Sequence, residues 1–104
     1  MDKMMKIGNV WVDSGHIIIG DPVYTEDMKY DKLLKNPKAF KKDHFQVGKN
    51  LAVISSSGMG DGEYPVYAKV GKFGKFGTRT KSVTIVFDTA KERQMVNKLM
   101  KKVI

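Results

Sequence analysis

The sequence contains no cysteine, which excludes disulfides, thiol catalysis, Cys-ligated zinc and iron–sulfur clusters. Long apolar runs are also missing: uncharged runs such as residues 17–19 and 51–54 are far shorter than the roughly 20 residues that cross a bilayer. The Met1-Asp2-Lys3 start has no charged region followed by an apolar one, so no signal peptide is expected. These absences predict a cytoplasmic protein that does not contact the membrane.

Acidic residues are few and unevenly placed. There are 11 Asp and Glu against 19 Lys and Arg, a net charge of +8. Residues 69–87 contain five cations and no acid, and residues 29–49 contain seven Lys and two Asp, whereas residues 1–28 and 50–68 are net negative. Such a field attracts an anionic partner: a nucleotide, a nucleic acid or an acidic protein face. The alternative is a solvated surface that keeps a small domain in solution.

The length of 104 residues and a hydrophobic content of 41% predict one domain, residues 1–104. Apolar and β-branched patterning predicts four or five strands, and the first two of them are expected to form a hairpin around the turn at residues 13–15. The predicted strands cover residues 5–12, 16–19, 51–54, 64–70 and 80–87.

Two segments have helical spacing. Tyr30, Leu33 and Leu34 predict an amphipathic helix of about three turns over residues 26–36. Thr89 and Glu92 form a capping box for a C-terminal helix. The predicted class is α+β: a small antiparallel sheet or partly open barrel of four to five strands, a helical insertion near residues 26–45 and a C-terminal helix near residues 90–102.

Residues 60–67 read Gly-Asp-Gly-Glu-Tyr-Pro-Val-Tyr, and an earlier Ser-Gly and Asp-Pro pair occurs within residues 14–22. Together these segments resemble a family of small, mostly uncharacterised bacterial and phage proteins with a Gly-Asp-Gly-x-Tyr-Pro-Val-Tyr signature. The resemblance implies a fold and a bacterial or phage setting, which for a phage protein is the host cytoplasm, but it implies no reaction.

The glycines at positions 58, 60 and 62 suit a tight strand-to-strand loop. A dinucleotide fingerprint needs Gly-x-Gly-x-x-Gly before a helix, and this spacing differs. Successive Gly amides can form an anion nest, in which Asp61 opposes a phosphate. Ligand contact at Asp61 therefore stays an alternative to a structural turn.

Asp13, Asp21 and Asp61 invite a metal or acid–base interpretation. Asp beside Gly or Pro is also ordinary turn chemistry, and no recognised ligand spacing is present. We therefore assign no catalytic residue, no metal and no cofactor. His16 is expected to pack beside an apolar strand.

Tyr64 and Tyr67 stand on either side of Pro65. We expect one ring in the core and the other free to stack on a ligand. Because Pro65 cannot donate to a ladder, it predicts an edge strand or a bulge, and an edge strand is a route to a homo-oligomer. Trp11 is expected in the core.

The segment 69–81 is the strongest candidate for a binding site. It offers a loop of about eight residues with three glycines, and Phe73 and Phe76 have no evident core to fill. Cations interleaved with aromatic rings can engage phosphates and stack on bases, or the rings can anchor in a protein pocket. A hairpin whose rings fold back on the sheet is the alternative. The expected partner-binding residues are Lys69, Lys72, Phe73, Lys75, Phe76, Arg79 and Lys81, with Tyr64, Tyr67 and Asp61.

Three functions are consistent with these features. The first is a non-enzymatic, phage-type binding protein that acts in host takeover or counter-defence by engaging a nucleotide signal or a host protein that handles nucleic acid. The second is a direct DNA- or RNA-binding module that uses the basic loop and the Lys residues of 29–49. The third is a metal-dependent phosphodiesterase or hydrolase built on Asp13, Asp21 and Asp61.

Overall fold

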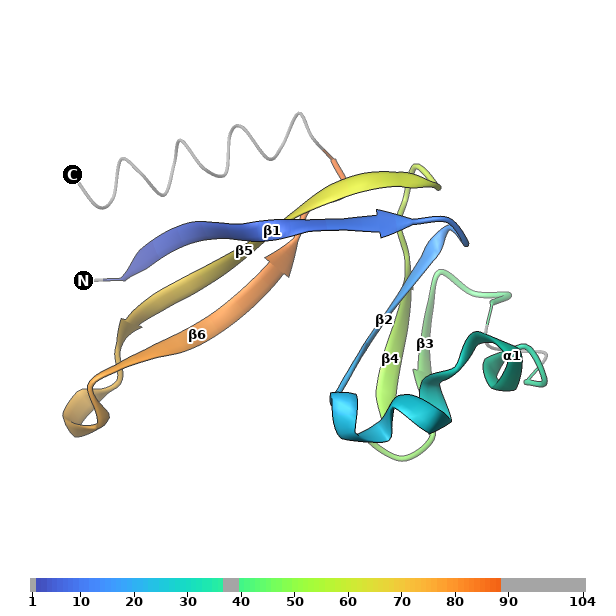
Figure 1. The fold of residues 1–104 in the computed structure, drawn as a ribbon, viewed down its shortest axis with the longest axis horizontal. Helices are drawn as coiled ribbons and strands as arrows, with labels where there is room; N and C mark the ends of the chain where they lie inside the picture. The colour runs from blue at the N-terminus through green and yellow to red at the C-terminus, as the bar shows by residue number, and fades with distance from the viewer. Residues whose placement is uncertain (1, 37–39, 89–104) are drawn as a thin grey trace. The chain divides into compact units, whose positions relative to one another are not determined.

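The computed structural model describes residues 2–36 and 40–88, and within them strands predominate (51% strand, 17% helix) (Figure 1). The strands form two three-stranded sheets, ordered β1-β5-β6 and β2-β4-β3. The elements are β1 (Lys3–Val12), β2 (His16–Gly20), the 3₁₀ helix η1 (Pro22–Met28), α1 (Tyr30–Leu33), β3 (His44–Val47), β4 (Ala52–Ser56), β5 (Gly62–Lys72), the 3₁₀ helix η2 (Gly74–Phe76) and β6 (Thr78–Ile85).

The predicted α+β class is therefore wrong. It placed four to five strands in one sheet or barrel, and the described residues form two separate sheets with little helix. The C-terminal helix predicted near residues 90–102 lies outside the described residues. In the described part of the chain, no helix has both the length and the apolar character needed to cross a membrane.

The chain divides into two compact units. The first combines Met1–Trp11 with Gly62–Ile104, and the second is Val12–Asp61. The chain therefore passes from one unit to the other at Trp11/Val12 and again at Asp61/Gly62. The second crossing lies within the signature at residues 60–67.

In the first unit, β5 is the central strand and pairs antiparallel with β6, from Val66 opposite Ile85 to Lys72 opposite Thr78. Side chains on both faces of β5 are buried, from Tyr64 through Ala68. An edge strand at Pro65 is thus a wrong prediction. Pro65 has no N–H to donate, but its carbonyl oxygen accepts a hydrogen bond from the Val86 N–H at 3.1 Å.

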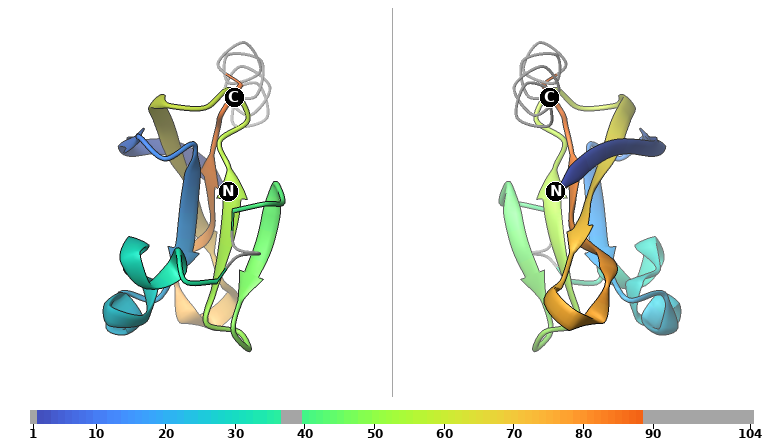
Figure 2. Two further views of the ribbon diagram at one scale, coloured as in Figure 1. Left: turned by 90° about the vertical axis from the view of Figure 1, so that its right-hand side faces the viewer. Right: turned by 90° about the vertical axis from the view of Figure 1, so that its left-hand side faces the viewer.

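In the second unit, β4 lies between β2 and β3 (Figure 2). Ile54 of β4 is opposite Ile18 on one side and Phe45 on the other. Because directly opposed residues share a face, these three side chains point the same way. The core of the unit consists of Leu33 and Ile54, with Ile18, Phe40, Phe45 and Val47 packed against them.

The helical insertion is much shorter than predicted. Asp21 caps η1 by accepting from the Val23 N–H at 2.9 Å, with Pro22 at the first helical position. Lys29 is extended (φ −63°, ψ 138°) and separates η1 from the four-residue α1. The predicted three-turn helix over residues 26–36 is thus wrong, and the 26–45 insertion includes the start of strand β3.

The hairpin predicted from the first two strands is also wrong, because β1 and β2 belong to different sheets. The turn between them instead contacts the glycine loop through Ser57, which is fully buried. The Ser57 N–H donates to the Gly15 carbonyl oxygen at 2.9 Å. The Ser57 hydroxyl lies within hydrogen-bonding distance of the Gly15 and Gly60 carbonyl oxygens. Ser57 therefore links Gly15 in the first signature segment to Gly60 in the second.

Candidate functional site

The end of the β5–β6 hairpin is a five-residue turn, residues 73–77, because β5 continues to Lys72 and β6 begins at Thr78. The Phe73 N–H donates to the Gly77 carbonyl oxygen at 2.8 Å, and the Phe76 N–H donates to the Phe73 carbonyl oxygen at 3.1 Å. Gly74 (φ 55°) and Gly77 (φ 78°) adopt the left-handed backbone that this turn requires. The predicted loop of about eight residues was too long, and five residues are ordinary for a hairpin. Turn length by itself is therefore no sign of function.

The two phenylalanines of the turn are exposed, as predicted. Phe73 is 54% exposed and Phe76 is 61% exposed, so neither ring folds back on the sheet. The Lys75 Nζ atom lies 5.6 Å from the centroid of the Phe76 ring, within cation–π range. The turn thus presents apolar rings beside a cation at the surface.

The five cations of the hairpin fall into two groups. Lys69 and Lys81 form ion pairs with Asp2, at 3.5 Å and 3.0 Å from its carboxylate oxygens. Within residues 2–36 and 40–88, no acidic side chain forms an ion pair with Lys72, Lys75 or Arg79. Arg79 donates to the Thr78 carbonyl oxygen at 2.9 Å, which leaves other guanidinium donors for a partner.

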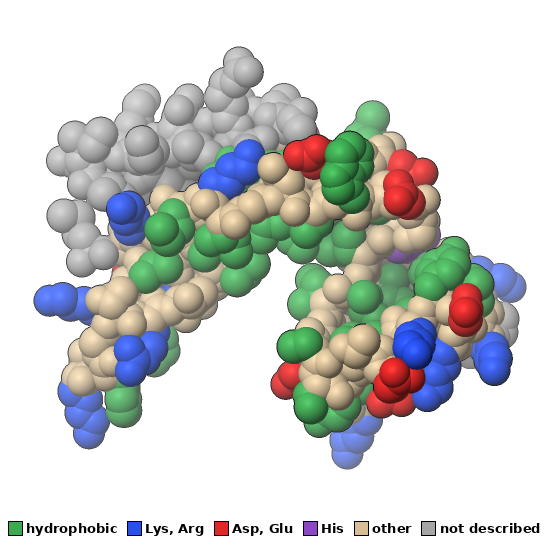
Figure 3. All heavy atoms as spheres, viewed as in Figure 1, with side chains coloured by type: hydrophobic (Ala, Val, Ile, Leu, Met, Phe, Trp, Pro, Cys, Tyr) green, Lys and Arg blue, Asp and Glu red, His purple; other side chains and the backbone are tan. Residues whose placement is uncertain are grey.

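Lys72 and Arg79 lie on opposite faces of the hairpin. Lys72 is paired with Thr78, the neighbour of Arg79, and successive residues of a strand point to opposite faces. Lys75 belongs to the turn between them. Figure 3 shows Lys and Arg side chains projecting around the end of the hairpin. We define Lys72, Phe73, Lys75, Phe76 and Arg79 as the hairpin tip.

Asp2 immediately precedes β1, and its side chain lies beside Gly71 of β5. A Cβ atom at Gly71, which is buried, would collide with the Asp2 carboxylate, so glycine makes room for this side chain. The hydrogen bond from Lys81 is the main cause that holds the pKa of Asp2 below its ordinary value, and the charges of Lys81 and Lys69 add to it.

We predict that Lys81→Met raises the pKa of Asp2 toward its ordinary value, because the substitution removes the largest cause of the shift. A pKa lowered by folding gives stability that is present above the pKa of an unfolded Asp, about 3.9, and is lost as the pH falls through the lower folded value. Lys81→Met should therefore lose less folding stability than the unmodified protein as the pH falls through this range. An NMR titration of the Asp2 carboxyl carbon measures the shift. Lys72→Met is the matched control, and equal pKa values in the two variants would contradict the assignment to Lys81.

The remaining candidate residues do not join the hairpin tip. Tyr64 and Tyr67 are both buried (5% and 7% exposed), and the Tyr64 ring packs edge-on against Phe87 with centroids 5.2 Å apart. Neither tyrosine ring is therefore offered to a partner at the surface. Asp61 is an exposed loop residue beside the crossing to the first unit. Trp11, expected in the core, is 74% exposed.

Asp13, Asp21 and Asp61 are not part of a metal centre in the part of the chain that the structure describes, where no three His, Asp or Glu side chains are grouped to hold a metal ion. Asp21 is already used as the cap of η1. Asp21 therefore has the turn role that the sequence analysis gave as the alternative to a metal or acid–base role.

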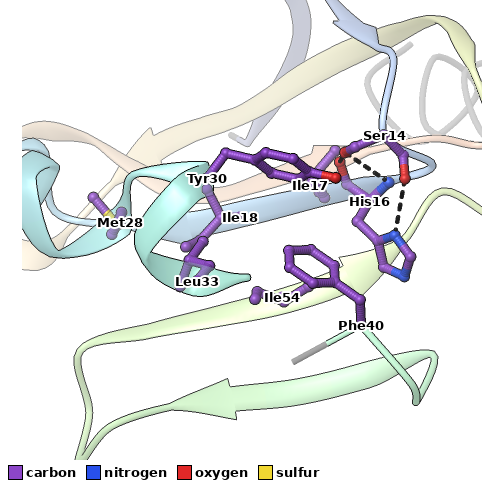
Figure 4. A pocket seen from close by; sticks show the side chains of 9 residues that line it. All are labelled: Ser14, His16, Ile17, Ile18, Met28, Tyr30, Leu33, Phe40 and Ile54. Atoms are coloured by element: carbon purple, nitrogen blue, oxygen red, sulfur yellow. Dashed lines mark hydrogen bonds between the residues drawn. The ribbon is translucent and has the colours of Figure 1, made fainter. Parts of the chain in front are cut away.

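The second unit contains a pocket of about 120 Å³ that the sequence did not predict (Figure 4). His16 packs edge-on against Phe40 at 5.2 Å between ring centroids, and its Nδ1 atom donates to the Ser14 carbonyl oxygen at 3.1 Å. The packing expected for His16 is thus confirmed. The walls come from β2, β4, α1 and residues near them, which only the fold brings together. The lining residues are Ser14, His16, Ile17, Ile18, Met28, Tyr30, Leu33, Phe40 and Ile54.

This pocket does not suit an anionic ligand. Its lining contains no Lys or Arg. Its volume of about 120 Å³ is also below the roughly 300–1,000 Å³ of typical ligand pockets. The pocket therefore lacks the cations that recognition of an anionic partner requires.

Comparisons of the chain with protein families, with curated proteins and with solved structures gave no match. The resemblance to the Gly-Asp-Gly-x-Tyr-Pro-Val-Tyr proteins stays a prediction from the sequence. The functional assignment depends on the residues of the hairpin tip.

Proposed function

We propose that this chain is a non-enzymatic binding protein that engages an anionic partner through the hairpin tip. The observation that supports the proposal is the grouping of Lys72, Lys75 and Arg79, without acidic partners among the described residues, around two exposed phenylalanines. A cluster of exposed cations raises the concentration of anions near the protein surface and speeds their binding to the protein. Exposed aromatic rings supply the contact area that commonly dominates binding energy.

Binding is favoured over catalysis by where the acidic residues lie. A hydrolase built on Asp13, Asp21 and Asp61 requires these carboxylates to converge, and the described residues contain no such cluster. The hairpin tip has no carboxylate or histidine that could act as a general base. The site therefore suits recognition of an anion.

The proposed setting comes from the signature at residues 60–67, which resembles phage and bacterial proteins. In a phage protein, an anionic target suits host takeover or counter-defence. The targets to consider are a nucleotide signal, a host protein that handles nucleic acid, and nucleic acid itself. All of them present phosphates or carboxylates to Lys and Arg.

The first experiment uses the protein as purified from cells, after nuclease treatment and a high-salt wash. The 260/280 nm absorbance ratio is recorded, and whatever is released on denaturation is identified by mass spectrometry. A released nucleotide supports tight capture of a small anion. A protein-only spectrum excludes it and directs the binding assay to larger anions.

The binding assay then compares two charge-matched variants by fluorescence anisotropy with three labelled probes: a thymidine 15-mer, a dinucleotide and a Glu-rich peptide. Lys72→Ala/Lys75→Ala/Arg79→Ala removes the free cations of the tip. Lys41→Ala/Lys42→Ala/Lys49→Ala removes the same charge from the second unit. We expect the first variant to lose at least about tenfold in affinity for a bound probe, since each charge-assisted contact contributes about 1.5–3 kcal/mol. Equal losses in both variants, or no loss in either, would show that the tip is not the site.

A further inference from the structure

We infer that the hairpin tip binds single-stranded nucleic acid, with Phe73 and Phe76 stacking on bases and the three free cations contacting phosphates. This inference rests on the proposed function and specifies its partner. Two properties of the tip support it: the distribution of its charges and the exposure of its rings.

The three free cations of the hairpin tip are not confined to one face of it. Lys72 and Arg79 lie on opposite faces of the β5–β6 ribbon, and Lys75 belongs to the turn that joins the strands. A flat acidic protein surface meets one face of a ribbon at a time. A flexible polyanion with a phosphate at every nucleotide can follow the chain around the tip and reach all three cations.

The rings require a partner with flat apolar faces. Phe73 and Phe76 are both more than half exposed. An unpaired base offers a π-face of similar size to a phenyl ring, whereas the bases of a duplex are already stacked on their neighbours. The Lys75 ammonium lies over one face of the Phe76 ring, 5.6 Å from its centroid, which leaves the opposite face for a base to stack on. Acidic side chains do not provide the flat face that would use these rings.

The number of free cations sets the salt dependence. Three phosphate contacts on a single strand give a slope of log K against log[salt] of about −2. Stacking does not release counterions, so it adds affinity without changing this slope. The two contributions can therefore be separated by substituting one set of residues at a time.

The test measures anisotropy of a labelled thymidine 15-mer across a salt series with the full chain, alongside the same sequence as a duplex and a Glu-rich 15-residue peptide. We expect the single strand to bind most tightly, with a slope of about −2. Phe73→Ala/Phe76→Ala should weaken this binding at least about fivefold and leave the slope unchanged. The variant Lys72→Ala/Lys75→Ala/Arg79→Ala should have a slope that is less steep by about two.

Phe73→Leu/Phe76→Leu separates stacking from simple apolar contact. The substitutions keep apolar side chains at two exposed positions. Circular dichroism of each variant tests whether it is folded. We expect a loss close to that of the Ala variant, because leucine has no ring to stack. Full affinity in the Leu variant would overturn stacking. If the probe that depends on the hairpin tip for binding is the duplex or the peptide, the single-strand assignment is overturned and the proposed function stands. If no probe depends on the hairpin tip for binding, both are overturned.

Discussion

Ile54→Ala is expected to lower the free energy of unfolding by about 2–5 kcal/mol, the usual range for removing most of a large aliphatic side chain from a core. Ile54 is 1% exposed and faces Ile18 and Phe45 from the two neighbouring strands. It is one of the two buried residues of its cluster, with Leu33. The truncation also enlarges the adjoining pocket, because Ile54 is part of its lining.

Urea denaturation followed by circular dichroism measures this loss, and hydrogen exchange of the β4 amides locates it. Val53→Ala is the matched control: Val53 is the preceding residue of the strand, is 46% exposed and points to the other face. We expect its cost to be below about 1 kcal/mol. If the two variants lost the same stability, Ile54 would not be at the centre of the core.

Ser57→Ala is expected to cost about 1–3 kcal/mol, a large effect for the loss of one oxygen atom. Ser57 has no exposed surface, so its hydroxyl cannot replace a lost protein partner with water. The hydroxyl is shared between the carbonyl oxygens of Gly15 and Gly60, and the backbone N–H of the same residue already donates to Gly15. Alanine keeps the backbone bond and removes the side-chain bond, so the turn after β1 and the glycine loop lose part of their connection.

The control for this variant is Ser55→Ala, two residues earlier. The Ser55 hydroxyl donates to the adjacent Ser56 carbonyl oxygen and is only half-buried, so we expect a smaller cost. Thermal unfolding compares the two variants, and hydrogen exchange around Gly15 reports on the connection directly. A Ser57→Ala protein as stable as the Ser55→Ala protein would mean that the connection depends on the backbone bond alone.

The strands could be predicted from the sequence because their side chains alternate. All five predicted strand segments overlap β1, β2, β4, β5 and β6. The missed strand, β3, also alternates: Phe45 and Val47 are half-buried and His44 and Gln46 are exposed. We assigned this stretch to a helical insertion because apolar residues at helical spacing precede it. This alternation is the sequence signal that indicates a strand here.

Pairing could not be predicted, because it depends on contacts between distant parts of the chain. Turn-forming residues at 13–15 suggested a hairpin, yet the strands on either side join different sheets. Likewise, Pro65 suggested an edge, but β5 is central and tolerates the missing N–H. The helix predicted over residues 26–36 failed because the cap is earlier, at Asp21-Pro22, and Lys29 breaks the helical backbone.

The candidate site was predicted in part. The exposed rings and the basic character of residues 69–81 followed from composition, since no acid lies within the segment. The division of its cations did not follow, because Asp2 is 79 residues from Lys81 in sequence and only the folded sheet brings them together. The burial of both Tyr64 and Tyr67 depends on the central position of β5, which one sequence does not reveal.

The division of the chain into a continuous unit and a discontinuous one has a consequence for synthesis on the ribosome. Val12–Asp61 is uninterrupted, so it can fold as soon as it has emerged. β1 is made first, but its partner β5 begins only at Gly62, so β1 must wait unpaired while the whole second unit is translated. Because the whole second unit separates β1 from β5 in sequence, we expect the β1–β5 pairing to form late in folding. A nascent chain stalled before β5 should therefore contain a folded second unit and a protease-sensitive N-terminal strand.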